Sequence, residues 1–427
     1  MTFFKNRNPG TMPLILEGIF FMIVFYLYNP FIQMFAKRMG ANDTHIALLN
    51  SVPSLVAIFV LIPCGILIER INRKKQTVMF LIFINSLFYA AIAFVPFIGH
   101  QAKVIAYVIL IGLMNCPGSL YLVTWKSYFS DNFTGAYGNN IYAVRSKYST
   151  FFGLITVLVT GFLLTSIPKS DGERLVMYQI FYGLCFILTL VQLLLFSRVS
   201  GQQEQQAAET ALKVDAAAAS GEILKKIKIV DMLSDKFFLT FCLCGFVSHF
   251  AWQMGWPLFF YYNVDYAHLN EFQLSLTSVA SGFAEFLSYS FWNRLIEKKG
   301  SNHSLVIAAA ALAINPFCFL VLWNFPVILL MNMVLGISTA GFNLSLFTTL
   351  LETLPAANKT AYISAFNTIT NITGFIAPLI GVWIYSNTNI YLAFGITGVF
   401  RVAGAVLYMV RLRKVVHIRL DSSSIRG

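Results

Sequence analysis

Twelve stretches of mostly apolar residues, each of roughly 20 residues, follow one another along this chain of 427 residues. An α-helix needs about that length to cross the hydrocarbon core of a bilayer. Inside that core every backbone N–H and C=O group must be bonded within the protein, so a chain of this pattern folds as a bundle of helices. The predicted spans are 12–36, 46–68, 77–98, 103–125, 141–165, 174–197, 237–262, 272–295, 304–325, 327–351, 361–385 and 390–411.

The composition excludes a water-soluble domain. Charged residues make up 11% of the chain and hydrophobic residues 57%, whereas soluble domains carry about 25% charged residues. The net charge of +12 could indicate a nucleic-acid partner, but its distribution indicates membrane topology instead. With both termini in the cytoplasm, 24 of the 30 Lys and Arg residues fall in cytoplasmic segments and five in external loops. This bias obeys the positive-inside rule, so we expect no nucleic-acid partner and a multi-pass protein whose N- and C-termini are cytoplasmic.

The chain divides into two halves that resemble each other. Pro30 in the first span and Pro257 in the seventh are 227 residues apart, and Glu69 and Glu297 are 228 apart. Matching positions that recur in the same order predict two parallel pseudo-repeats of six helices. We therefore expect an N-terminal bundle (1–199), a cytoplasmic linker with an amphipathic helix (200–235), a C-terminal bundle (236–411) and a basic cytoplasmic tail (412–427).

A short basic loop lies between the second and third spans, with the sequence Gly-Ile-Leu-Ile-Glu-Arg-Ile-Asn-Arg-Lys-Lys from Gly65 to Lys75. It resembles the loop between helices two and three of major facilitator superfamily transporters, which has a glycine, an acid–arginine pair and a basic cluster. Here Glu69 replaces the commoner Asp, and Asn72 replaces the usual second Gly. A degenerate second copy surrounds Glu297.

The resemblance covers the whole chain and implies an all-α major facilitator fold with twelve transmembrane helices. It implies a central cavity lined by spans 1, 4, 7 and 10 and flanked by spans 2, 5, 8 and 11. The two basic loops would form a cytoplasmic gate that breaks and re-forms between states. The gate residues that we expect are Gly65, Glu69, Arg70, Arg73, Arg294, Glu297 and Lys298.

Three ionisable residues at membrane depth are candidates for proton coupling, since a charge there is costly and marks a functional site by default. Glu285 in span eight has no basic residue near it in the sequence, and its alternative role is a structural hydrogen bond. His249 shares a helical stripe with aromatic residues and could carry a proton or simply pack. Glu17 either faces the cavity or is a solvated acid in the first turns of its helix.

Polar and aromatic residues at similar depth are candidates to contact a solute. Tryptophan and glutamine suit an organic ligand through stacking and hydrogen bonds, and asparagines beside proline or glycine can bond a substrate. Arg401 lies in a supporting span, where we expect it to pair with an acid or with backbone carbonyls. The four charges around the loop after span four (Lys126, Asp131, Arg145 and Lys147) are interpreted as gate or topology charges. The substrate-cavity candidates are Tyr28, Asn29, Asn115, Trp252, Gln253, Trp256 and Asn343.

The pattern favours a secondary active transporter of a small organic solute, acting as a monomer in a bacterial plasma membrane by proton-coupled efflux. Two motifs common in drug exporters of the superfamily are missing, so uptake by a symporter or facilitator stays open. A non-transporting receptor or lipid-handling protein is the alternative of another class. Walker and hydrolase motifs are absent from the sequence, so we expect no enzyme, no cofactor and no metal.

Overall fold

The computed structural model describes residues 11–69, 73–99, 102–133, 135–199, 235–321, 323–354 and 359–424, and within these it leaves out the side chains of 61–69, 130, 135–140, 359–361 and 414–424. The described residues form helices and no strand. The amphipathic helix expected within 200–235 and much of the basic tail expected at 412–427 lie outside the described residues or side chains.

The chain separates into two compact units. The first unit comprises Met1–Ala41 and Phe59–Ile223, and the second comprises Asn42–Ile58 and Leu224–Gly427. Helix α3 (Asp43–Glu69) therefore contributes its first part to the second unit.

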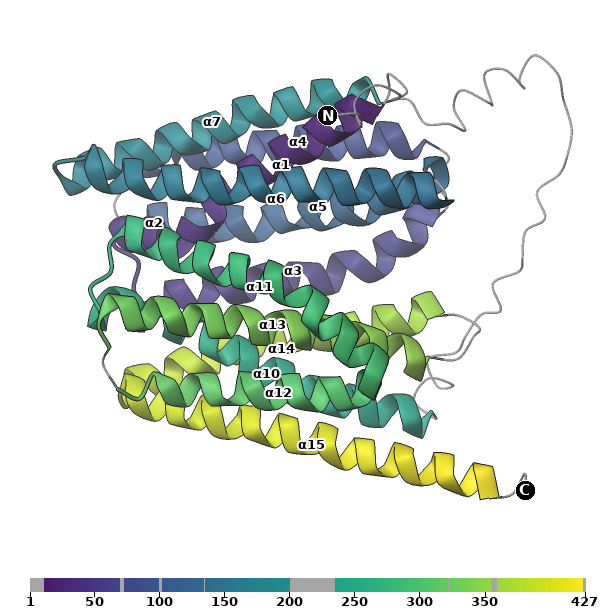
Figure 1. Cartoon of the computed structure of the whole chain (residues 1–427). Coiled ribbons are helices and arrows are strands. Elements are labelled where there is room, and N and C mark those ends of the chain that lie inside the picture. The colour runs from purple at the N-terminus through teal and green to yellow at the C-terminus, as the bar shows by residue number, and fades with distance from the viewer. Residues whose placement is uncertain are drawn as a thin grey trace, which may run out of the picture. The chain divides into compact units, whose positions relative to one another are not determined.

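The first unit is a bundle whose helices run side by side along their length (Figure 1). Helix α1 packs against α6 and α7, and α4 packs against α5 and α7. Apolar side chains from α1, α4, α5, α6 and α7 meet in one core, which includes Leu14, Val78, Trp125 and Phe196. The helices besides α3 are α1 (Thr11–Tyr28), α2 (Ile32–Arg38), α4 (Lys74–Phe94), α5 (Ala102–Asn132), α6 (Gly135–Ser166) and α7 (Asp171–Ser197).

The second unit is also helical, and its most extensive packing joins α11 to α13, α10 to α14 and α12 to α15. Its core gathers around Phe241, Trp292, Phe342 and Phe366. The first part of α3 is held here because the Tyr261 hydroxyl donates to the Asp43 carbonyl oxygen at 3.2 Å. The helices are α10 (Lys236–Tyr261), α11 (Glu271–Lys299), α12 (Ser301–Cys318), α13 (Phe325–Thr353), α14 (Lys359–Asn387) and α15 (Ile390–Ser424).

Prolines mark two changes of helix type. Pro30 lacks a backbone N–H, and the chain passes there through a 3₁₀ turn, Asn29–Phe31, between α1 and α2. Pro257 stays inside α10, which continues into a π-helical turn, Tyr262–Tyr266.

Eleven segments of the described residues are long and apolar enough to cross a membrane. They match eleven of the twelve predicted spans. The exception is the predicted span 272–295, which forms the 29-residue helix α11 but carries five serines that lower its hydropathy. The segments are Thr11–Arg38, Asp43–Val60, Lys74–Phe97, Ala102–Phe129, Ile141–Ser166, Asp171–Ser197, Lys236–Tyr266, Ser301–Cys318, Phe325–Thr353, Tyr362–Asn387 and Ile390–Arg413.

Candidate functional site

A buried ion pair joins α1 to α6 in the first unit. Glu17 of α1 is fully buried, and its Oε2 lies 2.9 Å from Nη2 of Arg145 in α6. Its Oε1 accepts hydrogen bonds from the Tyr121 hydroxyl of α5 at 2.6 Å and from Nε2 of Gln192 in α7 at 2.8 Å. A buried carboxylate is stable as an ion only when it is paired and hydrogen-bonded in this way. The four residues Glu17, Tyr121, Arg145 and Gln192 are called the Glu17 cluster below.

Aromatic rings hold the arginine of the cluster in place. The Arg145 guanidinium carbon lies 4.1 Å from the ring centroid of Trp125, and this geometry gives a cation–π interaction. Phe129 stacks on Trp125 with 5.3 Å between ring centroids. Gly18 lies against the Arg145 side chain, where a Cβ would collide with it. The pair is therefore enclosed by apolar groups, in which its electrostatic attraction is stronger than in water.

Sequence reasoning found Glu17 but missed its partners. The solvated alternative for Glu17 is excluded because its side chain has no exposed surface. Arg145 was interpreted as a gate or topology charge, but its side chain is 11% exposed and pairs with Glu17, four residues inside the membrane-length segment Ile141–Ser166. Of the other three loop charges, Asp131 pairs with Lys74 at 2.6 Å, while Lys126 and Lys147 are exposed. Tyr121 and Gln192 look like ordinary residues of the fourth and sixth spans, and only their hydrogen bonds to Glu17 of the first span give them a role.

Four residues predicted from helical spacing to share one stripe all lie on α10. They are His249, Trp252, Gln253 and Trp256, called the His249 stripe below. His249, Trp252 and Gln253 are partly accessible, and Trp256 is 44% exposed. The His249 ring contacts Trp252, Phe342 and Phe366 with centroid distances of 6.0, 5.9 and 5.9 Å. This arrangement places one imidazole among three aromatic rings.

Gln253 is engaged within the unit. Its Oε1 accepts from the Thr373 hydroxyl at 2.7 Å, and its Nε2 donates to the Thr370 carbonyl oxygen at 3.3 Å. Both partners belong to α14, so the amide joins α10 to α14.

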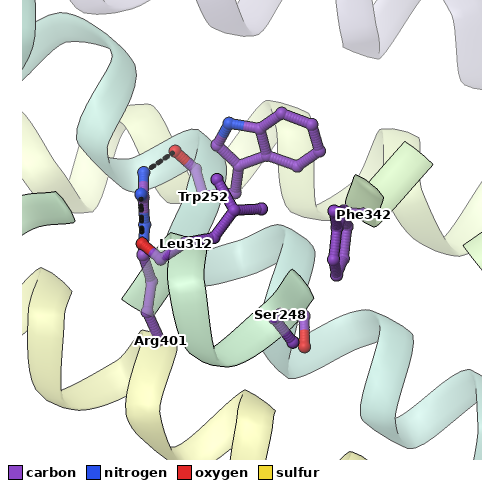
Figure 2. Close-up of a pocket in the computed structure, with 6 residues that line it drawn as sticks. Ser248, Trp252, Leu312, Phe342 and Arg401 are labelled. Carbon is purple, nitrogen blue, oxygen red and sulfur yellow. Dashed lines mark hydrogen bonds between the residues drawn. The ribbon is translucent and has the colours of Figure 1, made fainter. Parts of the chain in front are cut away.

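Arg401 of α15 is 5% exposed and forms no ion pair within the described part of the chain. Its Nη1 donates to the Leu312 carbonyl oxygen at 3.1 Å, and its Nη2 donates to that of Trp252 at 3.5 Å (Figure 2). Pairing with backbone carbonyls is one of the two outcomes predicted for this residue. The adjoining cavity, lined also by Ser248 and Phe342, has a volume of about 20 Å³. That is room for about one water molecule and far less than an organic solute needs.

Glu285 lies on α11 and is partly accessible. Its Oε1 accepts a hydrogen bond from the Tyr289 hydroxyl at 2.9 Å, one helical turn away. No Lys or Arg within the described residues forms an ion pair with it. Glu285 and Glu17 thus differ in environment, since only Glu17 has a cationic partner.

The remaining cavity candidates are spread over both units. Tyr28 packs against Tyr89 at 5.2 Å between ring centroids. Asn115 lies partly buried inside α5, where its Oδ1 accepts from the Ser119 hydroxyl at 3.4 Å. Asn29 and Asn343 are exposed in the described structure.

The expected gate residues fall partly outside the described part of the chain. The surroundings of Gly65 and the side chain of Glu69 are not described, nor is any part of Arg70. The second set is exposed at the end of α11 and comprises Arg294, Glu297 and Lys298; Arg73 is also exposed. Asn293 donates to Glu297 Oε1 at 2.9 Å. The described His, Cys, Asp and Glu residues form no group of three or more that could hold a metal ion.

Comparison with known proteins places these features in a family. The family model of the Major Facilitator Superfamily matches residues 14–243 and 241–424, and so matches each half of the chain once. None of the curated proteins matches this sequence.

Solved structures with the same fold include three transporters. The nucleoside transporter NupG aligns with a TM-score of 0.70 at 14% identity, covering 95% of this chain and 99% of its own. A bacterial homologue of the human lysosomal transporter Spinster, inward-facing and unoccupied, aligns at 0.67 and 14% identity over 96% and 98%. A variant of the peptide transporter POT in complex with sulfate aligns at 0.69 and 14% identity over 97% and 96%. At this identity the likeness establishes the fold.

Proposed function

Because the chain belongs to the major facilitator superfamily, we propose that it is a secondary active transporter that exports a small organic solute in exchange for protons. The two six-helix halves, 1–199 and 236–411, would rock about a central site in the plasma membrane, with the protein acting as a monomer. The basic loops around Glu69 and Glu297 would form the cytoplasmic gate, and both termini would be cytoplasmic.

The Glu17 cluster is the observation that carries proton coupling. Its carboxylate is held by one cation and two neutral donors from three other helices. A proton that binds Glu17 removes the negative charge and leaves the buried Arg145 without its counter-ion, which is costly in a low-dielectric interior. Relief of that cost requires Arg145 to move toward water or toward an anionic group. Protonation would therefore change how α1 and α6 pack, and this is what coupling to a rocking motion requires.

Glu285 is the second candidate. Its partial accessibility and single tyrosine partner suit a group that exchanges protons without moving a helix. His249 is the third, and its bond to Gly245 is local to α10. The geometry therefore favours Glu17 over Glu285 and His249.

Uptake is the alternative direction. The structural neighbours include a nucleoside transporter and a peptide transporter. A receptor or lipid-handling protein on the same scaffold would bind a ligand without moving it.

Purified protein in liposomes loaded with a pH-sensitive dye tests the proposal. A solute panel is screened for proton flux, and wild type is compared with Glu17→Gln and Glu285→Gln. Asp171→Asn, at an exposed surface ion pair, serves as the control. We expect solute-driven proton flux to fall at least about tenfold in Glu17→Gln while solute exchange at equal concentrations continues.

Each other outcome has a definite meaning. Loss of proton flux in Glu285→Gln alone would transfer the coupling role to Glu285. Proton flux of the opposite sign would establish uptake. Solute exchange without any proton flux would overturn coupling, and ligand binding without solute movement would overturn transport itself.

A further inference from the structure

One hydrogen bond determines which nitrogen of the His249 ring is the donor and which is the acceptor. Its Nδ1 lies 2.9 Å from the carbonyl oxygen of Gly245, one turn earlier in α10. A carbonyl oxygen only accepts, so Nδ1 must carry the hydrogen of that bond. In the neutral imidazole the other nitrogen, Nε2, is then an acceptor with a free lone pair. No described residue bonds to Nε2.

The surroundings of His249 favour this neutral form. Three aromatic rings, of Trp252, Phe342 and Phe366, surround the imidazole, and no described carboxylate forms an ion pair with it. Apolar neighbours disfavour an imidazolium ion, because a charge without water or a counter-ion is expensive to bury. The neutral imidazole thus offers one acceptor nitrogen, Nε2, beside three aromatic rings.

Two larger polar side chains near His249 already make hydrogen bonds inside the unit. Both functional ends of the Gln253 amide bond to α14. Arg401 donates from two of its nitrogens to the carbonyl oxygens of Leu312 and Trp252, as Figure 2 shows. The accessible side of α10 therefore offers a solute aromatic surface and one strong acceptor, with no charge exposed beside it.

We propose that His249, Trp252 and Trp256 form a subsite for an uncharged aromatic solute that carries an N–H or O–H donor. The solute ring packs against the two indole rings, and its donor bonds to His249 Nε2. This inference deepens the proposed transport function and rests on it for its physiological meaning. The binding itself is a separate property of α10, and it is measured separately.

Matched probe pairs test the proposal by calorimetry on the purified full-length protein. Indole is compared with 1-methylindole, and 2-naphthol with 2-methoxynaphthalene, because methylation removes the donor at the cost of one added methyl group. One neutral hydrogen bond contributes about 1 kcal/mol, so we expect the donor-bearing probe to bind about fivefold more tightly in wild type. His249→Phe keeps a ring of similar size but has no acceptor, and we expect the two members of each pair to bind it equally.

Two further variants control for folding and for nonspecific aromatic binding. His249→Gln supplies an acceptor oxygen and should restore part of the preference. Trp383→Phe changes an indole on α14 that is 66% exposed and should leave the preference unchanged. Melting temperatures of all variants show whether any loss is due to unfolding.

Three results would overturn the subsite: no preference in wild type, a preference that persists in His249→Phe, or tighter binding of a carboxylated probe such as 2-naphthoate. The last result would identify Arg401 as an anion-binding group. A confirmed preference without solute flux in liposomes would preserve the subsite and refute transport, so the two proposals fail separately.

Discussion

Glu17 shows how one buried carboxylate can join four helices. Each of its three hydrogen bonds comes from a different helix, and the charge of Arg145 balances its own. The pair matters less as a source of stability than as a constraint, because two ions taken out of water gain little net free energy from their attraction. Losing one member is costly, since the other charge stays buried and unpaired.

Removing Arg145 should therefore destabilise the protein more than removing both charges. We expect Arg145→Gln to lower the free energy of unfolding by about 3–5 kcal/mol, and Glu17→Gln combined with Arg145→Gln to cost clearly less than the sum of the single changes. Thermal unfolding of the four proteins in detergent checks this cycle. Arg38→Gln, which breaks the surface pair with Asp171, is the matched control and should cost less than about 1 kcal/mol. Additive effects of the two cluster substitutions would contradict the pairing.

The sequence could predict the acid of the Glu17 cluster but not the residues that bind it. An acid in an apolar span is conspicuous, so Glu17 was found. Arg145 escaped because the predicted span began at 141, and an arginine near a span end is expected to lie at the cytoplasmic surface. The membrane-length segment Ile141–Ser166 agrees with the predicted span, so the boundary was not at fault. Hydropathy alone does not reveal that an arginine about one turn inside a span pairs with an acid on another helix.

At the scale of elements, helix packing in the second unit depends on small residues. Gly336 of α13 lies against the backbone of Ser281 in α11, where a Cβ would overlap the carbonyl group. Nearby, Trp292 of α11 covers Gly341 and donates from its indole nitrogen to the Ile337 carbonyl oxygen at 2.8 Å. Close backbone approach at small residues is a common way for helices to associate in membranes. Glycine spacing alone could not have identified the partner helix.

A single methyl group at Gly336 should separate the two helices. We expect Gly336→Ala to lower the free energy of unfolding by about 1–3 kcal/mol, since the backbone carbonyl it meets cannot turn away as a side chain can. Gly183→Ala in α7 is the control, because nothing lies within 4 Å of the added Cβ. It should be neutral or stabilising by up to about 1 kcal/mol. Equal melting temperatures for the Gly336 variant and wild type would show that α11 and α13 are farther apart in the membrane.

For the whole molecule, the sequence predicted the class of fold correctly because hydrophobic length is a strong physical constraint. The family match to each half confirms the major facilitator fold. The grouping of Asn42–Ile58 with the second unit was not predictable. It depends on contacts such as that between Tyr261 and Asp43, which are far apart in the sequence and have no periodic pattern. Periodicity identifies a helix, but only side-chain complementarity decides what it packs against.

Orientation in the membrane follows from charge and is a prediction for the whole molecule. Of the 30 Lys and Arg residues, only five fall in the segments expected outside, whereas the linker at 200–235 alone carries four. Translocating that linker would carry these positive charges across the membrane, against the positive-inside bias. Alkaline phosphatase fused after Ser170 should therefore be active, and green fluorescent protein fused after Ser220 should fluoresce. The reverse pattern at both sites would show that the protein has the opposite orientation. The loops around Glu69 and Glu297 would then lie outside the cell, where they could not act as a cytoplasmic gate.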